Sequence, residues 1–256
     1  MSFKPVKRQL AVDEVAAQLR REVLSGSIRP GELFPPERQL AETLGVSRLT
    51  LRAALSRLYG QGLVTIRQGD GVRAADFRRR STLDVLVDLF DVFATDVEAG
   101  TKLLRDLLEL RRVLAAEMVA LSCARKTKET LKRLAERVDA LEALASKNVT
   151  RREIAAAEIE ISHALVEASG NAAFGLILNT LERFNEVHPE VVEGIQVDPM
   201  FLVASYRQLV ASIEAGDAQA ARQMVVEGMA AIDETVVQQF IDSKRKPQPS
   251  KPTPTE

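Results

Sequence analysis

Apolar positions in the first 75 residues follow two different spacings. Apolar residues that recur every three or four positions predict helices over 12–25, 36–44 and 47–61. After the third helix, Val64 and Ile66 alternate with polar residues, as in a half-buried strand, and Gly69-Asp70-Gly71 predicts a turn into a second strand. A short strand is also expected at Leu33-Phe34. Three helices followed by a hairpin with a glycine-rich tip indicate a winged helix-turn-helix.

The rest of the chain is almost purely helical in its pattern. Helical runs are expected near 85–94, 101–124, 127–146, 150–168, 172–187, 199–214 and 218–241. The break at Gly216-Asp217 places a residue that favours the N-cap directly after a glycine that favours a helix end. The predicted fold class is therefore mainly α, with an N-terminal winged helix-turn-helix and a C-terminal all-α bundle of about seven helices.

Charge is distributed unevenly over the segments that this pattern defines. The segments are a basic arm (1–10), a winged helix-turn-helix domain (11–77), a polar linker (78–84), a helical domain (85–242) and a basic, proline-rich tail expected to be disordered (243–256). Residues 1–80 carry a net charge of +7, whereas residues 81–256 carry −8. A basic first third suggests a polyanionic partner for that domain and another task for the remainder.

Several classes of protein are not expected from this sequence. The single Cys123 cannot form an internal disulfide, and its apolar helical surroundings predict a buried thiol. There is no apolar run of the ~20 residues that span a bilayer and no signal-peptide pattern, so a cytoplasmic protein is expected. We do not expect an enzyme, because no nucleophile–base pair or phosphate loop is present and the two histidines, His163 and His188, are 25 residues apart.

The predicted third helix carries the chemistry of DNA recognition. Arg48 and Arg52 lie four residues apart and so share a face near the start of that helix, the part that meets base edges in the major groove. An arginine there can bind guanine O6 and N7 with both arms of its guanidinium group. The full set of expected contacts to a double-stranded operator comprises Arg38, Ser47, Arg48, Thr50, Arg52, Gln68 and Gly69.

Segments of this region resemble the GntR family of bacterial transcription regulators. The resemblance rests on LSGSIRPGELFPPERQLA (24–41), LGVSR (44–48), GLV (62–64) and QGDG (68–71), and it covers residues 10 to about 76 without a gap. It implies a homodimeric repressor or activator that binds a short palindrome, with Arg38, Arg48, Arg52 and Gly69 among its DNA contacts. Leu49 departs from the pattern, because many members have a small polar residue there.

The helical domain resembles the FadR branch of that family, on the segments LLELR (107–111), EASGN (167–171) and ASIEAGD (211–217). Most members of the branch have a buried metal site, formed by an aspartate four residues before a histidine and by two later histidines. This chain keeps His163 but has Ile159, Tyr206 and Gly228 at the other positions. We therefore expect no metal or other cofactor, and His163 is interpreted as a hydrogen-bonded core histidine.

At these departing positions the chain resembles the fatty-acid-responsive members of the branch, which lack the metal and bind long-chain acyl-CoA. That resemblance implies a small-molecule effector in the helical domain, bound by Arg111, Tyr206 and Gly228. Arg111 would supply a cation for an anionic ligand inside an apolar bundle.

Three other interpretations remain open at this stage. The effector could instead be a small carboxylate or sugar acid anchored by Arg111. Arg111 could form a structural ion pair with Glu117 or Glu158, and Tyr206 could be core packing. The chain could also be an architectural DNA-binding protein with no ligand, in which case the bundle interior would be fully packed.

Overall fold

The computed structural model describes residues 9–67, 69–147, 149–189, 191 and 197–245. It divides into two compact units, Met1–Thr95 and Asp96–Glu256. The arm is described only from residue 9, where the first helix already begins, and the tail only to residue 245, where the last helix ends. The remaining residues of both predicted segments lie outside the described part of the chain.

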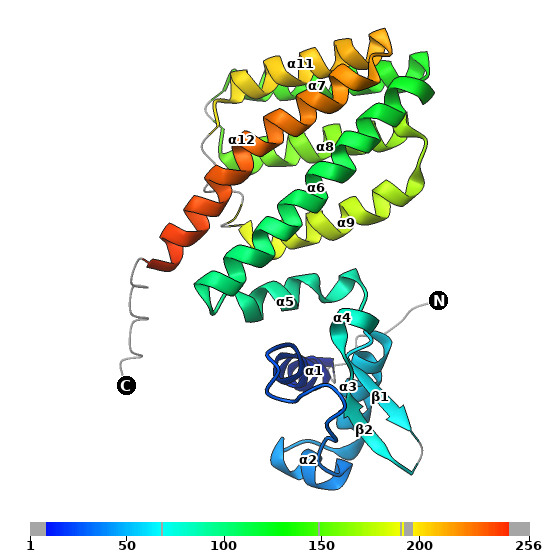
Figure 1. Cartoon of the computed structure of the whole chain (residues 1–256), viewed down its shortest axis with the longest axis vertical. Helices are drawn as coiled ribbons and strands as arrows, with labels where there is room; N and C mark the ends of the chain where they lie inside the picture. The colour runs from blue at the N-terminus through cyan, green and yellow to red at the C-terminus, as the bar shows by residue number, and fades with distance from the viewer. Residues whose placement is uncertain (1–8, 68, 148, 190, 192–196, 246–256) are drawn as a thin grey trace, which may run out of the picture. The chain divides into compact units, whose positions relative to one another are not determined.

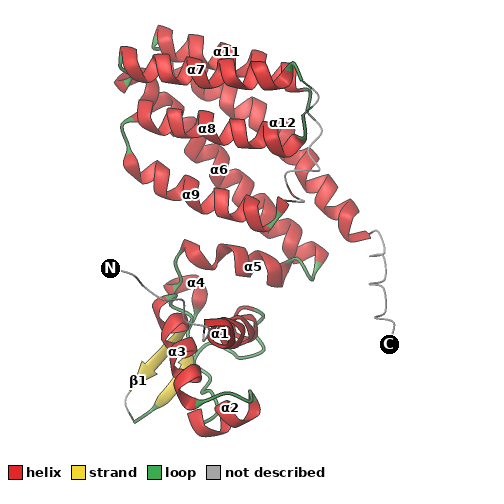
Figure 2. Ribbon diagram, turned by 180° about the vertical axis from the view of Figure 1, so that it is seen from behind, coloured by secondary structure: helices red, strands yellow, loops and turns green. Residues whose placement is uncertain are grey.

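The first unit is the predicted winged helix-turn-helix, followed by three short helical segments (Figure 2). Its elements are α1 (Gln9–Leu24), α2 (Glu37–Thr43), α3 (Arg48–Gly60), β1 (Val64–Arg67), β2 (Gly71–Ala74), α4 (Phe77–Arg80), the 3₁₀ turn η1 (Leu83–Val85) and α5 (Leu86–Phe93). Helix α3 packs against α1, α2 and β1. Its buried face carries Leu51, Leu55 and Leu58, as predicted.

The hairpin is antiparallel and pairs Val64 with Ala74 at its open end. The predicted strand at Leu33-Phe34 is reduced to an isolated bridge between Leu33 and Arg73, and the Phe34 N–H donates to the Val72 carbonyl at 2.8 Å. The chain before α2 therefore lies alongside β2 and is hydrogen-bonded to it.

The boundary between the two units differs from the sequence-based one. Residues 78–84 were expected to be a linker and residue 85 the start of the helical domain, but α4 and η1 are helical and α5 packs against α1. Val85 is buried in the core of the first unit, and Leu89 and Val92 pack against that core. Arg20 on α1 binds Asp88 on α5 at 2.5 Å, so the first unit extends to Thr95.

The second unit is a helical bundle (Figure 1). Its helices are α6 (Val97–Arg125), α7 (Lys128–Ala145), α8 (Arg151–Ser169), α9 (Ala172–Val187), α11 (Pro199–Ala215) and α12 (Ala218–Arg245). Helix α6 packs against α8, α11 and α12, while α7 packs against α8 and α11. All seven predicted helical runs are thus helices, but the first of them, α5, belongs to the other unit.

Capping residues mark the starts of several helices, which is why the sequence predicted their bounds. The hydroxyl groups of Thr127 and Thr150 accept hydrogen bonds at the starts of α7 and α8, and both residues complete capping boxes. Asp217 accepts from the Ala220 N–H at the start of α12, as predicted. No helix in the described part of the chain is long and apolar enough to cross a membrane.

Candidate DNA-binding surface and ligand cavity

Arg48 is the first residue of α3, and its side chain is exposed. Ser47 caps this helix, with its Oγ accepting from the Thr50 N–H at 3.1 Å and lying 2.8 Å from Thr50 Oγ1. Both hydroxyl groups, predicted to contact DNA, are therefore engaged with each other in the cap. Within the described residues Arg48 makes no ion pair, so its guanidinium group is available to a base edge.

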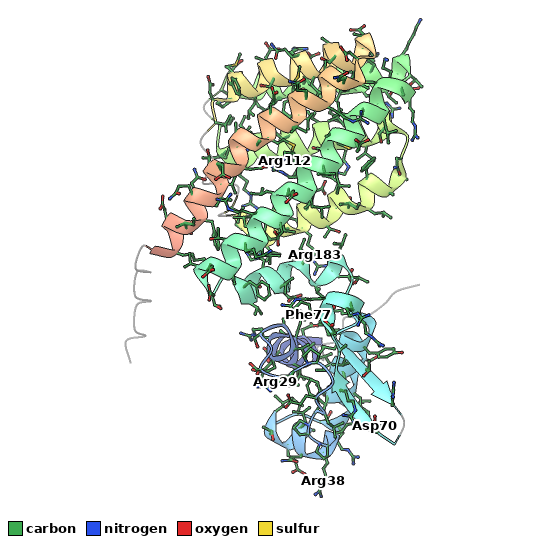
Figure 3. All side chains as sticks on the ribbon, viewed as in Figure 1. Arg29, Arg38, Asp70, Phe77, Arg112 and Arg183 are labelled. Atoms are coloured by element: carbon green, nitrogen blue, oxygen red, sulfur yellow. The ribbon has the colours of Figure 1, made fainter. Side chains whose placement is uncertain are left out.

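The other two arginines of this surface have carboxylate partners. Arg52 Nε donates to Glu37 Oε2 on α2 at 2.7 Å, whereas Arg38 Nε lies 3.9 Å from Glu42 Oε1 on its own helix. Figure 3 shows Arg38 projecting from α2 away from the body of the unit. Arg52 must release or share Glu37 before it can bind a base, while the longer Arg38 pair is readily exchanged for a phosphate.

At the tip of the β1–β2 hairpin, a glycine without a side chain precedes an aspartate that is paired with an arginine. Gly69 has a positive φ of 82° and would have nothing within 4 Å of an added Cβ, so its main chain is open to a close partner. Asp70 binds Arg73 through both carboxylate oxygens, and that hydrogen-bonded guanidinium group lowers the pKa of Asp70. The ion pair neutralises the negative charge of Asp70, which would otherwise repel a phosphate backbone. Gln68, also predicted as a contact, lies outside the described residues.

The second unit contains a cavity of about 350 Å³ between α6, α8, α9, α11 and α12. Most of its lining is apolar and includes Leu104, Leu108, Met118, Ile159, Phe174, Ile177, Leu181, Met224 and Ile232. The three predicted effector residues, Arg111, Tyr206 and Gly228, all line it. The three residues therefore meet at one cavity, and their role in binding an effector stays a prediction.

Arg111 has a partner that differs from both acids considered in the sequence. Its Nη2 lies 2.8 Å from Asp233 Oδ1 on α12, and Arg112 Nη1 binds the other oxygen of the same carboxylate at 2.9 Å. Asp233 is buried, and burial raises its pKa even though two guanidinium groups oppose that shift. Glu117 instead pairs with Arg222, and Glu158 with Arg151.

Tyr206 belongs to a polar cluster on the cavity wall. Its hydroxyl hydrogen-bonds Glu158, which also accepts from Arg151 Nη1 at 2.6 Å. Burial first, and then the charge of Glu158, raises the pKa of Tyr206 far above its ordinary value, so the phenol remains a neutral donor. In the described part of the chain, the buried Nε atoms of Arg111 and Arg151 have no hydrogen-bond partner.

The residues present do not fit the metal site of the family branch. His163 Nε2 lies 2.6 Å from Glu182 Oε1 on α9, and Ile159, Tyr206 and Gly228 line the cavity instead of metal ligands. The sequence suggests a core histidine at this position, but His163 is only partly buried and is not a core residue. Among the described residues, no group of three or more His, Cys, Asp or Glu side chains could hold a metal ion.

Comparison with known proteins assigns the family. A model described as bacterial regulatory proteins, gntR family, matches residues 11–73, and an FCD domain model matches residues 106–231. The HTH-type transcriptional regulator Mce2R of Mycobacterium tuberculosis is 31% identical over 223 residues, which span 87% of this chain and 90% of the relative. The chain belongs to the GntR family. As a GntR protein it is a DNA-binding transcription regulator and not an enzyme.

Two further comparisons concern other proteins that this GntR protein resembles. A fatty acid metabolism regulator protein of Pectobacterium atrosepticum is 32% identical over 154 residues, 60% of each chain. The solved structure of Lar, described as controlling the agr system of Listeria monocytogenes, has a TM-score of 0.53 at 16% identity, covering 93% of this chain and 99% of that one. The latter supports the fold alone.

We predict that Arg48→Ala weakens binding to the operator far more than it alters stability. A bidentate arginine–guanine contact is worth about 1–3 kcal/mol, so each lost contact should weaken binding roughly 5- to 150-fold. The measurement is fluorescence anisotropy with an operator duplex obtained by selection from a random library.

Arg57→Ala is the matched control for Arg48→Ala, because Arg57 lies in the last turn of α3 and pairs with Asp13 on α1. Its affinity for the operator should stay near that of the wild type. Equal losses in the two variants would show that α3 does not present its first turn to the bases.

Part of the cavity chemistry could not be found from the sequence. Asp233 and Arg151 come from α12 and α8, and no short motif links either of them to Arg111. The only signal was indirect: an arginine predicted on the inner side of an apolar bundle requires an anionic partner. That rule indicates that a partner exists without indicating which acid provides it.

Proposed function

We propose that this chain is a homodimeric transcription regulator whose binding to a palindromic operator is controlled by a ligand in the cavity of the second unit. The cavity itself carries the proposal. Its volume of about 350 Å³ lies within the ~300–1,000 Å³ usual for ligand pockets. A purely architectural protein would have no need of such a space in the interior of its bundle.

Long-chain acyl-CoA is the effector that we propose. The apolar lining suits an acyl chain, whose burial is worth ~0.8 kcal/mol per methylene group. Arg111 and Arg151 would face the polar end of the ligand, and each has a buried Nε–H available as a donor. The names of relatives such as the Pectobacterium atrosepticum fatty acid metabolism regulator protein support this class of ligand.

A small carboxylate or sugar acid is the second candidate, and one observation favours it. The buried Nε–H groups of Arg111 and Arg151, which both line the cavity, have no hydrogen-bond partner among the described residues. A small monoanion could accept from these two donors. Such a small acid would leave much of the apolar cavity unfilled, which is why we place it second.

The proposed mechanism is a change in the spacing of the two DNA-reading units of a dimer. A dimer contacts two half-sites one helical turn of DNA apart, so its affinity depends on that spacing. A ligand held between α6, α8, α9, α11 and α12 would shift these helices and thereby alter the spacing. The coupling requires that the ligand bind more tightly to one arrangement than to the other.

Native mass spectrometry of the full chain tests the proposal. We expect a dimer that gains one palmitoyl-CoA per subunit and then releases the selected operator in an anisotropy assay. Gain of lactate or gluconate instead would support the second candidate. A monomer, or a dimer whose operator affinity is unchanged by every one of these compounds, would overturn ligand control.

We predict that Gly228→Leu strongly weakens ligand binding without unfolding the protein. Gly228 lines the cavity within α12, and an added Cβ would meet no atom within 4 Å, so a larger side chain grows into empty space. Leucine is also a better helix former than glycine, which costs about 0.8–1.0 kcal/mol relative to alanine inside a helix. Isothermal titration with palmitoyl-CoA should show at least roughly tenfold weaker binding, because a filled cavity excludes the chain.

Val226→Leu is the control for the cavity variant. Val226 lies on the same helix two residues away, is exposed and does not line the cavity. Its ligand affinity should match that of the wild type. If Gly228→Leu also binds palmitoyl-CoA normally, the ligand does not occupy this cavity.

A further inference from the structure

The outward face of α3 is apolar at its centre. Leu51, Leu55 and Leu58 face the core, and the helical period places Leu49 and Ala53 almost opposite them. Leu49 is 73% exposed and Ala53 is exposed as well. Among the described side chains of the first unit, Leu49 is thus the most exposed large apolar one, although neither the core nor the cap of α3 requires it.

Polar groups lie beside this apolar centre and not on it. Arg48 and Arg52 are at the edge of the same exposed face, and Arg52 is drawn towards α2 by its ion pair with Glu37. The Thr50 hydroxyl is held in the cap by Ser47. The part of α3 that would enter deepest into a groove therefore presents carbon atoms, flanked by guanidinium groups.

We propose that Leu49, supported by Ala53, determines operator specificity by contacting the 5-methyl group of thymine. In the major groove, the thymine methyl is the one apolar feature among the base edges, so an apolar side chain distinguishes thymine from cytosine there. Leu49 is adjacent in sequence to Arg48, which places a methyl contact within one or two base pairs of the guanine that Arg48 would bind.

Small size at position 53 matters for the same contact. Ala53 follows Leu49 by one helical turn on the exposed face, and its single methyl group allows the helix to approach the base edges closely. A larger residue there would hold Leu49 away from the groove floor. The pair forms a continuous apolar ridge, one turn long, that excludes water from the methyl group.

Deoxyuridine substitution in the operator tests this proposal, because it removes the 5-methyl group and leaves every hydrogen-bonding group in place. The probe is the palindromic duplex selected from a random library by the full-length wild-type chain. Each thymine pair related by the two-fold axis is replaced by deoxyuridine in turn. Burying one methyl group is worth about a fourfold change in affinity, so one symmetric pair should weaken wild-type binding roughly 15-fold.

The variants show whether any effect belongs to Leu49. Leu49→Ala should bind the thymine duplex more weakly than the wild type and should bind the thymine and deoxyuridine duplexes equally. Tyr59→Ala is the matched control: Tyr59 is an exposed large side chain (57%) in the last turn of α3, and its loss should leave the deoxyuridine effect intact.

Two results would overturn the inference: no thymine pair sensitive to deoxyuridine, or a Leu49→Ala variant that remains as sensitive as the wild type. Either can occur while Arg48→Ala still loses affinity, in which case α3 enters the groove but Leu49 does not read thymine. If Arg48→Ala binds normally too, the docking of α3 itself is wrong.

Discussion

Gly62→Ala should lower the free energy of unfolding of the first unit by about 2–5 kcal/mol. Gly62 follows the end of α3 with a φ of +73°, a conformation that costs an L-residue about 1–2 kcal/mol. An added Cβ would also lie 2.2 Å from the Arg80 carbonyl oxygen, a backbone atom that cannot rotate away. The remaining cost is the displacement of the segment around Arg80 and Ser81.

Gly45→Ala separates the two contributions. Gly45 also has a positive φ, of 64°, but an added Cβ would meet nothing within 4 Å, so only the conformational cost applies. Hydrogen exchange in increasing urea, read by mass spectrometry on peptides of α1 and α3, measures both variants within the intact chain. Peptides from α7 should be unchanged, and equal effects of the two variants would contradict the close approach of Gly62 to Arg80.

Asp233→Asn should destabilise the second unit by about 2–3 kcal/mol, since it leaves two guanidinium groups without their shared anion. Removing one partner of a fully buried pair costs about 3–5 kcal/mol, and the arginines here keep some contact with water. Asp233 is 8% exposed, against 32% and 28% for Arg111 and Arg112. Urea unfolding followed by circular dichroism measures the shift in the transition assigned to the bundle.

Glu234→Gln is the control one residue further along α12. Glu234 binds Arg105 through both oxygens, but this pair is exposed to solvent and should contribute little. Its unfolding midpoint should stay at the wild-type value. A control that shifted as far as Asp233→Asn would indicate a general loss of negative charge on α12 and not the loss of a buried anchor.

Local rules predicted the helices and the hairpin because each depends on neighbouring residues. The caps at Ser47 and Asp217 and the apolar spacing of α3 are properties of a few consecutive positions. The unit boundary differs from the expected one because it depends on a distant contact. The apolar residues of α5 fit a bundle equally well, and only the packing of α5 on α1, with the Arg20–Asp88 pair, assigns it to the first unit.

The same distinction between local patterns and distant contacts applies to the candidate site. Arg111, Tyr206 and Gly228 were identified through their positions in a family pattern, and they do line one cavity. The actual partner of Arg111 lies 122 residues away in the sequence, and Glu117 and Glu158 were equally reasonable until the helices were placed. Side-chain pairing between helices depends on their rotation and crossing, which a single sequence does not specify.

The chain has no tryptophan, and its two tyrosines lie one in each unit. Tyr59 is on the exposed surface of α3, whereas Tyr206 lines the cavity and hydrogen-bonds Glu158. Tyrosine absorption and emission therefore arise from two chromophores in contrasting surroundings, one exposed to solvent and one in the cavity wall. The protein thus carries its own pair of optical labels, so that occupation of the cavity and DNA binding at α3 can be followed separately in the unmodified chain.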